Sequence, residues 1–174
     1  MLLLGINAGM GNTDLAMLPT KAVNLKTGWL DYPRPKTGMA RHVPLWAETV
    51  AAVKVALDER RSPKDPADKH LLFIGPRGES YVGKGRGERV HQEIARVLKW
   101  AKIERQGLSF YAARRAFQTV AEGIHDLAAV QSIMGYAPAS SDMSAVYRKK
   151  VDDVRLQAVT DHVHQWLFPE NKTK

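Results

Sequence analysis

The chain contains no cysteine, which excludes disulfides, a cysteine nucleophile and a thiolate metal site. It also lacks a long hydrophobic run. The apolar start MLLLGINAGM has no basic leading region and is far too short to cross a bilayer. No internal repeat and no low-complexity tract is visible. These absences indicate a soluble intracellular protein.

The charge is one-sided. The 174 residues suit a single compact domain, and 26 lysines and arginines stand against 18 acidic residues, giving a formal net charge of +8. That balance favours a polyanionic partner, most simply nucleic acid. Charge alone does not decide this, because many basic proteins bind no nucleic acid.

The first residues read as two short helices around a glycine-rich break. In LLLGINAGMGNTDLAML, Asn12 or Thr13 could cap the second helix, with Asp14 in its first turn. An abrupt start with an apolar helix suggests a fragment of a longer protein.

Two KTG strings mark tight turns between short extended runs. Gly28 and Gly38 would supply the positive φ that such turns require. Pro33 and Pro35 mean that the middle strand lies at an edge or ends early. We therefore expect a small three-stranded antiparallel sheet whose second hairpin carries Lys36 at its tip.

Helical spacing of apolar residues recurs through the rest of the chain. Helices are expected at WAETVAAVKVALDERR, ERVHQEIARVLKWAKI, SFYAARRAFQTVAEG, HDLAAVQSIMGY, the short DMSAVYRKK and DDVRLQAVTDHVHQWLF. Between them, SPKDPADKH reads as a polar loop, LLFIG as a short buried strand or extended segment, and PRGESYVGKGRG as a glycine-rich basic loop. The predicted fold class is mainly α with a small three-stranded antiparallel β-sheet (α+β).

Two adjacent arginines, Arg114 and Arg115, lie at the centre of an otherwise apolar helix. Such a pair needs an anion. A carboxylate of this chain, such as Glu122 or Asp126, could provide it, and so could a phosphate from outside. Neighbouring helical side chains are rotated by roughly 100° from each other, so both arginines cannot face one phosphate equally.

Three strings occur in an informative order: PKTGMARHVPL, SFYAARRAFQT and IMGYAPASSDMSAVYR. Together they resemble the catalytic domain of the tyrosine recombinases, the phage-integrase family, over residues 3–165. The string GMGNTDL resembles a variant found in integrase-like proteins of planctomycete bacteria. The resemblance implies the tyrosine-recombinase catalytic-domain fold, with residues 1–168 as an N-terminally truncated catalytic domain and 169–174 as a tail.

The resemblance assigns three residues to the chemistry of DNA cleavage. Tyr147 matches the nucleophile, whose phenol would form a 3′-phosphotyrosine. Arg114 matches the arginine of the family's H-x-x-R helix, and its guanidinium would stabilise charge on the non-bridging oxygens. Lys36 matches the hairpin lysine that would give a proton to the leaving 5′ oxygen. This chemistry implies no metal and no nucleotide cofactor.

Three other positions depart from the family pattern. Tyr111 holds the histidine position of H-x-x-R, and Tyr136 holds the histidine position of the family's LGH string. Either phenol could donate a hydrogen bond, but neither could carry positive charge. Gly11 stands where the family has its first arginine. In the planctomycete variant that arginine is also absent.

Simpler interpretations of these residues stay open. Lys36 could be a solvated turn residue, Tyr147 could pack in the core, and Tyr111 and Tyr136 could be core or hydrogen-bonding residues. The six histidines show no metal-ligand spacing.

The resemblance implies double-stranded DNA as the partner, a location in the bacterial cytoplasm or nucleoid, and self-association on DNA through the C-terminal helix. Five basic residues are candidate DNA contacts: Arg41, Lys84, Arg86, Arg115 and Arg148. We expect a site-specific recombinase that cleaves and rejoins DNA. The alternatives are a non-catalytic DNA-binding module of the same fold and, among enzymes, a type IB topoisomerase, whose usual pattern also includes the missing arginine.

Overall fold

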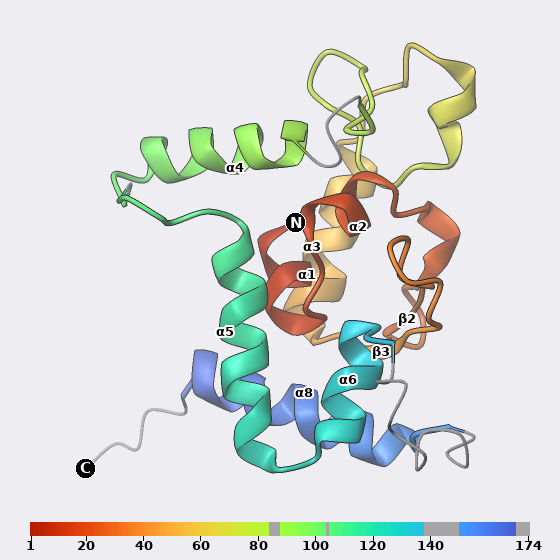
Figure 1. Cartoon of the computed structure of the whole chain (residues 1–174). Coiled ribbons are helices and arrows are strands. Elements are labelled where there is room, and N and C mark those ends of the chain that lie inside the picture. The colour runs from red at the N-terminus through yellow and green to blue at the C-terminus, as the bar shows by residue number, and fades with distance from the viewer. Residues whose placement is uncertain (84–87, 104, 138–149, 170–174) are drawn as a thin grey trace.

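The computed structural model describes residues 1–83, 88–103, 105–137 and 150–169. These residues form a mainly helical fold with one small sheet at its side (Figure 1). The helices are α1 (Leu2–Asn7), α2 (Asn12–Ala16), α3 (Ala47–Asp58), α4 (Glu88–Trp100), α5 (Tyr111–Ala121), α6 (Leu127–Met134) and α8 (Asp153–Leu167), and the strands are β1 (Val23–Asn24), β2 (Trp29–Asp31) and β3 (His42–Pro44). Short 3₁₀ helices cover Thr20–Ala22, Pro66–His70 and Glu122–Ile124.

The three strands pair antiparallel in the order β1-β2-β3, as predicted. Leu30 pairs with both Val23 and Val43, so the buried residue of each strand faces the same core. The middle strand ends at Asp31, ahead of the two prolines. Gly28 and Gly38 have φ of 73° and 69°, which confirms the two glycine turns.

Helix α1 lies at the centre of the fold and packs against α3, α5 and α8. A Cβ added at Gly5 would lie 2.7 Å from Cζ of Phe110, so α1 and the start of α5 approach too closely for a larger residue. Helix α8 contributes Leu156, Val159 and Val163 to the core, and it packs against α5, α6 and β3 of its own chain. Helix α4 lies apart from this group and contacts α2 (Figure 1).

One local prediction differs from the structure, and for the segment LLFIG the structure shows the second of the two predicted alternatives. Gly11, not Asn12 or Thr13, is the N-cap of α2. Its backbone N–H donates to the carboxylate of Asp14 at 2.8 Å, because an acidic residue three positions into the helix can reach back to the cap. The segment 71–75 is buried and extended but forms only isolated bridges, one of them from Leu71 to Pro19.

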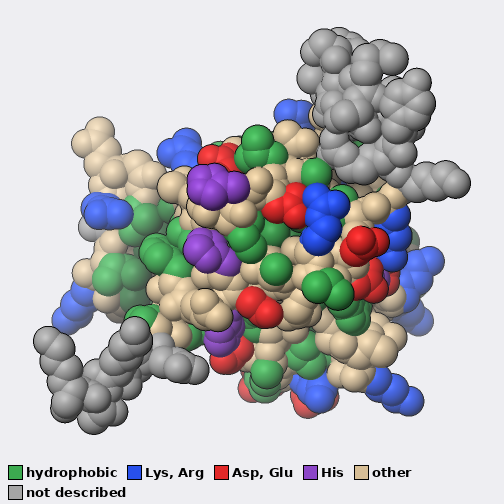
Figure 2. All heavy atoms as spheres, turned by 90° about the horizontal axis from the view of Figure 1, so that it is seen from below, with side chains coloured by type: hydrophobic (Ala, Val, Ile, Leu, Met, Phe, Trp, Pro, Cys, Tyr) green, Lys and Arg blue, Asp and Glu red, His purple; other side chains and the backbone are tan. Residues whose placement is uncertain are grey.

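The described helices include none that is long and apolar enough to cross a membrane. On the lower face of Figure 1, where α8 lies, basic, acidic and histidine side chains are interspersed among apolar ones (Figure 2). The described residues of this face therefore form no continuous basic surface.

Candidate functional site

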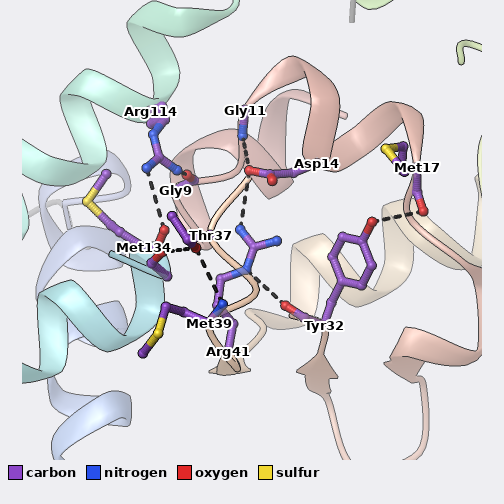
Figure 3. A network of polar contacts seen from close by, with 11 residues as sticks. Gly9, Gly11, Asp14, Met17, Tyr32, Thr37, Met39, Arg41, Arg114 and Met134 are labelled. Atoms are coloured by element: carbon purple, nitrogen blue, oxygen red, sulfur yellow. Dashed lines mark hydrogen bonds and ion pairs between the residues drawn. The ribbon is translucent and has the colours of Figure 1, made fainter. Parts of the chain in front are cut away.

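Arg114 is the largest fully buried side chain described, with 1% of its surface exposed. Its Nη1 donates to the carbonyl oxygen of Gly9, and its Nη2 lies 3.5 Å from the carbonyl oxygen of Met134 (Figure 3). Gly9 follows α1 and Met134 ends α6, so the guanidinium sits between two helix C-terminal ends. Those ends carry partial negative charge and favour a cation.

No carboxylate in the described part of the chain is ion-paired with Arg114. The two acidic residues considered from the sequence have other partners. Asp126 accepts two hydrogen bonds of 2.7 Å from Arg155, and Glu122 accepts one of 2.9 Å from Gln118. The carboxylate alternative for Arg114 is therefore wrong, and its guanidinium is held by carbonyl oxygens.

The end of α6 meets the tip of the β2–β3 hairpin. Gly135 ends the helix with φ of 62°, as predicted, and its carbonyl oxygen accepts a 2.8 Å hydrogen bond from the hydroxyl of Thr37. Lys36 precedes Thr37 in the turn and is exposed. The structure thus brings the hairpin that carries Lys36 to the helix end that contacts Arg114.

Tyr136 follows directly, and its ring contacts two arginines. The guanidinium carbons of Arg34 and Arg114 are each 5.3 Å from the centre of its ring, within cation–π distance. Its hydroxyl donates to Gln118 at 3.1 Å. Arg34 is not among the site residues predicted from the sequence, although it lies in PRPKTG, two residues before Lys36.

A second buried arginine, Arg41, is ion-paired with Asp14. Arg41 donates through Nη1 to Asp14 at 3.3 Å and through Nε to the carbonyl oxygen of Tyr32 at 2.9 Å (Figure 3). Arg41 is one of the DNA contacts predicted from the sequence, but none of its side chain is exposed. Arg41 is a structural residue here, because its guanidinium is needed to balance a buried carboxylate.

Burial and neighbouring charges shift the pKa of two groups in this network, Arg41 and Tyr32. Burial lowers the pKa of Arg41, the carboxylate of Asp14 opposes that shift, and the charges of Arg114 and Arg34 add to it. Arg34 and Arg114 are therefore each close enough to Arg41 to act on its charge. Burial, together with Asp14, also raises the pKa of Tyr32 to about 12, so its phenol stays protonated and donates to the carbonyl oxygen of Met17 at 2.9 Å.

Tyr111 and Arg115 lie elsewhere. Tyr111 is the first residue of α5, is 46% exposed, and has its ring 5.2 Å from the guanidinium carbon of Arg115. Arg115 is exposed while Arg114 is buried, so the two adjacent arginines diverge as the helical rotation predicts. The described contacts do not bring Tyr111 to the guanidinium of Arg114.

Four predicted residues lie outside the described part of the chain: Lys84, Arg86, Tyr147 and Arg148. The expected helix DMSAVYRKK, apart from its last residue Lys150, falls in the same gap as Tyr147 and Arg148. Their roles stay predictions.

A cavity of about 520 Å³ lies beside the site, between the hairpin, α6 and the residues before α8. Its lining includes three residues of the site described above: Arg41, Gly135 and Tyr136. The rest of its lining is a mixture of polar and apolar side chains: Asp31, Met39, Ala40, His42, Ala128, Gln131, Ser132, Lys150, Val151 and Leu156. The described residues contain no group of three or more histidine or acidic side chains placed to hold a metal ion.

Comparison with known proteins defines the class by fold. No protein-family model and no curated protein sequence matches the chain. Solved structures match over nearly its whole length, and the fold is that of the tyrosine-recombinase catalytic domain.

Three structures illustrate the match. The Tn1549 transposon integrase, in complex with a circular intermediate DNA, has 16% identity and a TM-score of 0.63 over 92% of this chain and 56% of its own. XerA recombinase has 18% identity and a TM-score of 0.62 over 97% and 57%. The integrase of mycobacterium phage Brujita has 21% identity and a TM-score of 0.62 over 93% and 50%. The chain thus spans about half the length of these proteins.

Proposed function

We propose that this chain is the catalytic domain of a site-specific DNA recombinase or integrase that cleaves and rejoins duplex DNA through a 3′-phosphotyrosine. The observation that carries the proposal is the meeting of Arg114, Tyr136 and the hairpin of Lys36 at the end of α6. These residues come from three separate parts of the sequence. Similar folds occur in an integrase and a recombinase whose structures contain their DNA.

The proposed reaction uses only side chains of this chain. The phenol oxygen of Tyr147 attacks phosphorus and loses its proton to solvent, which forms the Tyr–O–P bond and breaks the bond from phosphorus to the 5′ oxygen. Lys36 gives a proton to that leaving oxygen. Arg114 stabilises the charge that gathers on the non-bridging oxygens, with Tyr111 or Tyr136 as phenolic donors. Rejoining reverses these steps, so the phosphodiester energy is kept.

A second function, a DNA-binding module that keeps the fold without the chemistry, is favoured by two observations. Gly11 has no side chain where the family's first arginine stands, and Tyr111 contacts Arg115 rather than Arg114. Gly11 belongs to the string GMGNTDL, which resembles the planctomycete variant, and that variant also lacks the arginine.

Assembly on DNA through the C-terminal helix belongs to the proposal as well. In the structure α8 is packed in its own chain, so exchange would have to bury Leu156, Val159 and Val163 equally well in a partner. We place the protein at the DNA of the bacterial cytoplasm or nucleoid.

A nicked duplex separates the two functions. Cleavage beside the nick releases a short strand that diffuses away, so the covalent protein–DNA adduct accumulates and is counted on a denaturing gel. The enzyme forms the adduct, and Tyr147→Phe abolishes it. Binding without adduct in the unmodified chain and in Gly11→Arg would support the binding module instead.

A further inference from the structure

We propose that Arg34 supplies the second guanidinium of the phosphate site, the role for which Gly11 has no side chain. The inference rests on the proposed function, because it names a further residue for the same phosphate as Arg114. A phosphoryl group in transfer spreads negative charge over two non-bridging oxygens, and a single arginine cannot pair well with both from one side.

The position of Arg34 is set by the ring of Tyr136. Both guanidinium carbons lie 5.3 Å from the ring centre, so they are separated by at most twice that distance. A phosphate that accepts charge-assisted hydrogen bonds of about 2.8 Å on two sides bridges a gap of that order. The ring face also offsets part of the repulsion between the two cations while no anion is bound.

Arg41 is the other arginine of this cluster, and its guanidinium is already engaged. Its side chain is fully buried and bonds to Asp14 and to the carbonyl oxygen of Tyr32. Arg34 is only partly buried, and no described residue accepts a hydrogen bond or ion pair from its guanidinium. Of Arg34 and Arg41, Arg34 is therefore the one whose guanidinium is free to pair with an external phosphate.

The backbone holds Arg34 in the same turn as Lys36. Its carbonyl oxygen accepts from the N–H groups of Thr37 at 3.1 Å and Gly38 at 2.8 Å, and its own N–H donates to Met39 at 2.8 Å. The hairpin that brings the lysine thus brings a guanidinium with it. A missing arginine on α2 is offset by one on the hairpin.

Charge balance points the same way. Asp14 is the one carboxylate ion-paired within the described part of the cluster of Arg34, Arg41 and Arg114. The charges of Arg114 and Arg34 both lower the pKa of Arg41, in addition to the larger effect of burial. An anion bound beside Arg34 and Arg114 would offset the positive charge that these two residues direct at Arg41.

The test compares adduct formation on two nicked duplexes, one with the natural phosphate at the cleavage position and one with a neutral methylphosphonate there. A residue that pairs with the non-bridging charge matters less when that charge is removed. We expect Arg34→Ala to slow adduct formation by about a hundredfold on the phosphate duplex but by less than about tenfold on the methylphosphonate duplex. Arg34→Lys, which keeps the charge but not the planar fork, should be intermediate. Arg61→Ala, at an exposed arginine after α3, is the control and should give equal, small effects on both.

Three results overturn the inference. The first is an unchanged rate of adduct formation in Arg34→Ala. The second is a loss by the same factor on both duplexes, which would make Arg34 an ordinary contact to the DNA backbone. Either result leaves the proposed cleavage standing. If the unmodified chain binds both duplexes but forms no adduct with either, the proposed function fails and the inference fails with it. Thermal unfolding of Arg34→Ala, expected near that of the unmodified chain, excludes misfolding as the cause.

Discussion

The hydroxyl of Thr37 donates a 2.8 Å hydrogen bond to the carbonyl oxygen of Gly135, and this bond fastens the tip of the β2–β3 hairpin to the end of α6. Lys36 is the preceding residue, and Met134, on the other side of Gly135, contacts Arg114. The bond therefore limits how far the lysine can move from the buried guanidinium.

Replacing Thr37 with valine should detach the hairpin tip with little effect on the rest of the fold. The lost hydrogen bond costs about 1 kcal/mol in the free energy of unfolding. Adduct formation on a nicked duplex should slow by about tenfold, because Lys36 and Arg34 lose their fixed position. Thr27→Val, at the exposed tip of the other hairpin, is the control and should change neither quantity. Equal rates for both variants would separate the hairpin tip from catalysis.

Gly11→Arg tests whether the guanidinium of the family position can be restored. The backbone allows it: Gly11 has φ of −100° and ψ of 175°, and a Cβ there would lie 3.6 Å from Oδ2 of Asp14. Loss of the glycine N-cap costs on the order of 1 kcal/mol. We expect adduct formation by Arg34→Ala to rise by about tenfold when Gly11→Arg is added, since either arginine can serve the same phosphate. Gly11→Ala should give no such rise. Identical behaviour of the arginine and alanine variants would refute the exchange of roles.

Asp14→Asn removes the counter-charge of a buried arginine. The carboxylate of Asp14 is 6% exposed and balances Arg41, so the variant leaves an uncompensated buried charge. The free energy of unfolding should fall by about 3 kcal/mol, measured by urea denaturation at neutral pH. Asp31→Asn, whose carboxylate is 68% exposed beside His42, should cost less than about 1 kcal/mol. Similar losses for the two variants would contradict the assignment of Arg41 to the interior.

Gly135→Ala should be destabilising for two reasons, the left-handed backbone and crowding by neighbouring side chains. The same substitution at Gly107 separates them. Gly135 has φ of 62°, and an added Cβ would lie 2.8 Å from Cβ of Arg34 and 2.9 Å from Cδ of Arg41. Gly107 has φ of 78° with no atom within 4 Å of such a Cβ. We expect Gly107→Ala to cost about 1 kcal/mol for the left-handed backbone alone, and Gly135→Ala to cost about 3 kcal/mol. The difference in urea midpoint measures the crowding at Arg34 and Arg41, and equal costs would show that the two side chains move aside freely.

Binding to duplex DNA should weaken steeply with salt, because lysines and arginines displace counterions from phosphates. Between about 50 and 200 mM salt the affinity should fall by roughly a hundredfold or more, as measured by fluorescence anisotropy. Lys84→Ala and Arg86→Ala should each weaken binding modestly, to the same extent for unrelated sequences. An affinity that ignores salt would argue against a phosphate-binding surface.

Local signals in the sequence predicted most elements of the fold. The spacing of apolar residues gave the helices, and glycine gave the turns at Gly28 and Gly38 and the end of α6 at Gly135. The isolated bridges of segment 71–75 were less predictable, because pairing with Pro19 depends on tertiary placement.

The site was less accessible from sequence. The divergence of Arg114 and Arg115 follows from helix geometry, but the partners of Arg114 do not, because carbonyl oxygens leave no mark on residue identity. The pairing of Arg41 with Asp14 joins residues 27 positions apart, and an arginine on a hairpin reads as a surface contact until its burial is known. Arg34 was missed for a related reason: only the shared ring of Tyr136 connects it to Arg114.

The burial of Arg114 between two helix ends makes the fold more cooperative. One partner, Gly9, lies 105 residues earlier in the chain, and the other, Met134, lies 20 residues later. During synthesis, α1 therefore has to wait for α5 and α6 to emerge before this charge can be satisfied. In the finished protein, opening either α1 or α6 alone would strand a cation in an apolar interior, so partial unfolding at one end is penalised at the other. Hydrogen exchange in α1 and α6 should consequently report a single shared opening, because Arg114 joins α1, α5 and α6 into one folding unit.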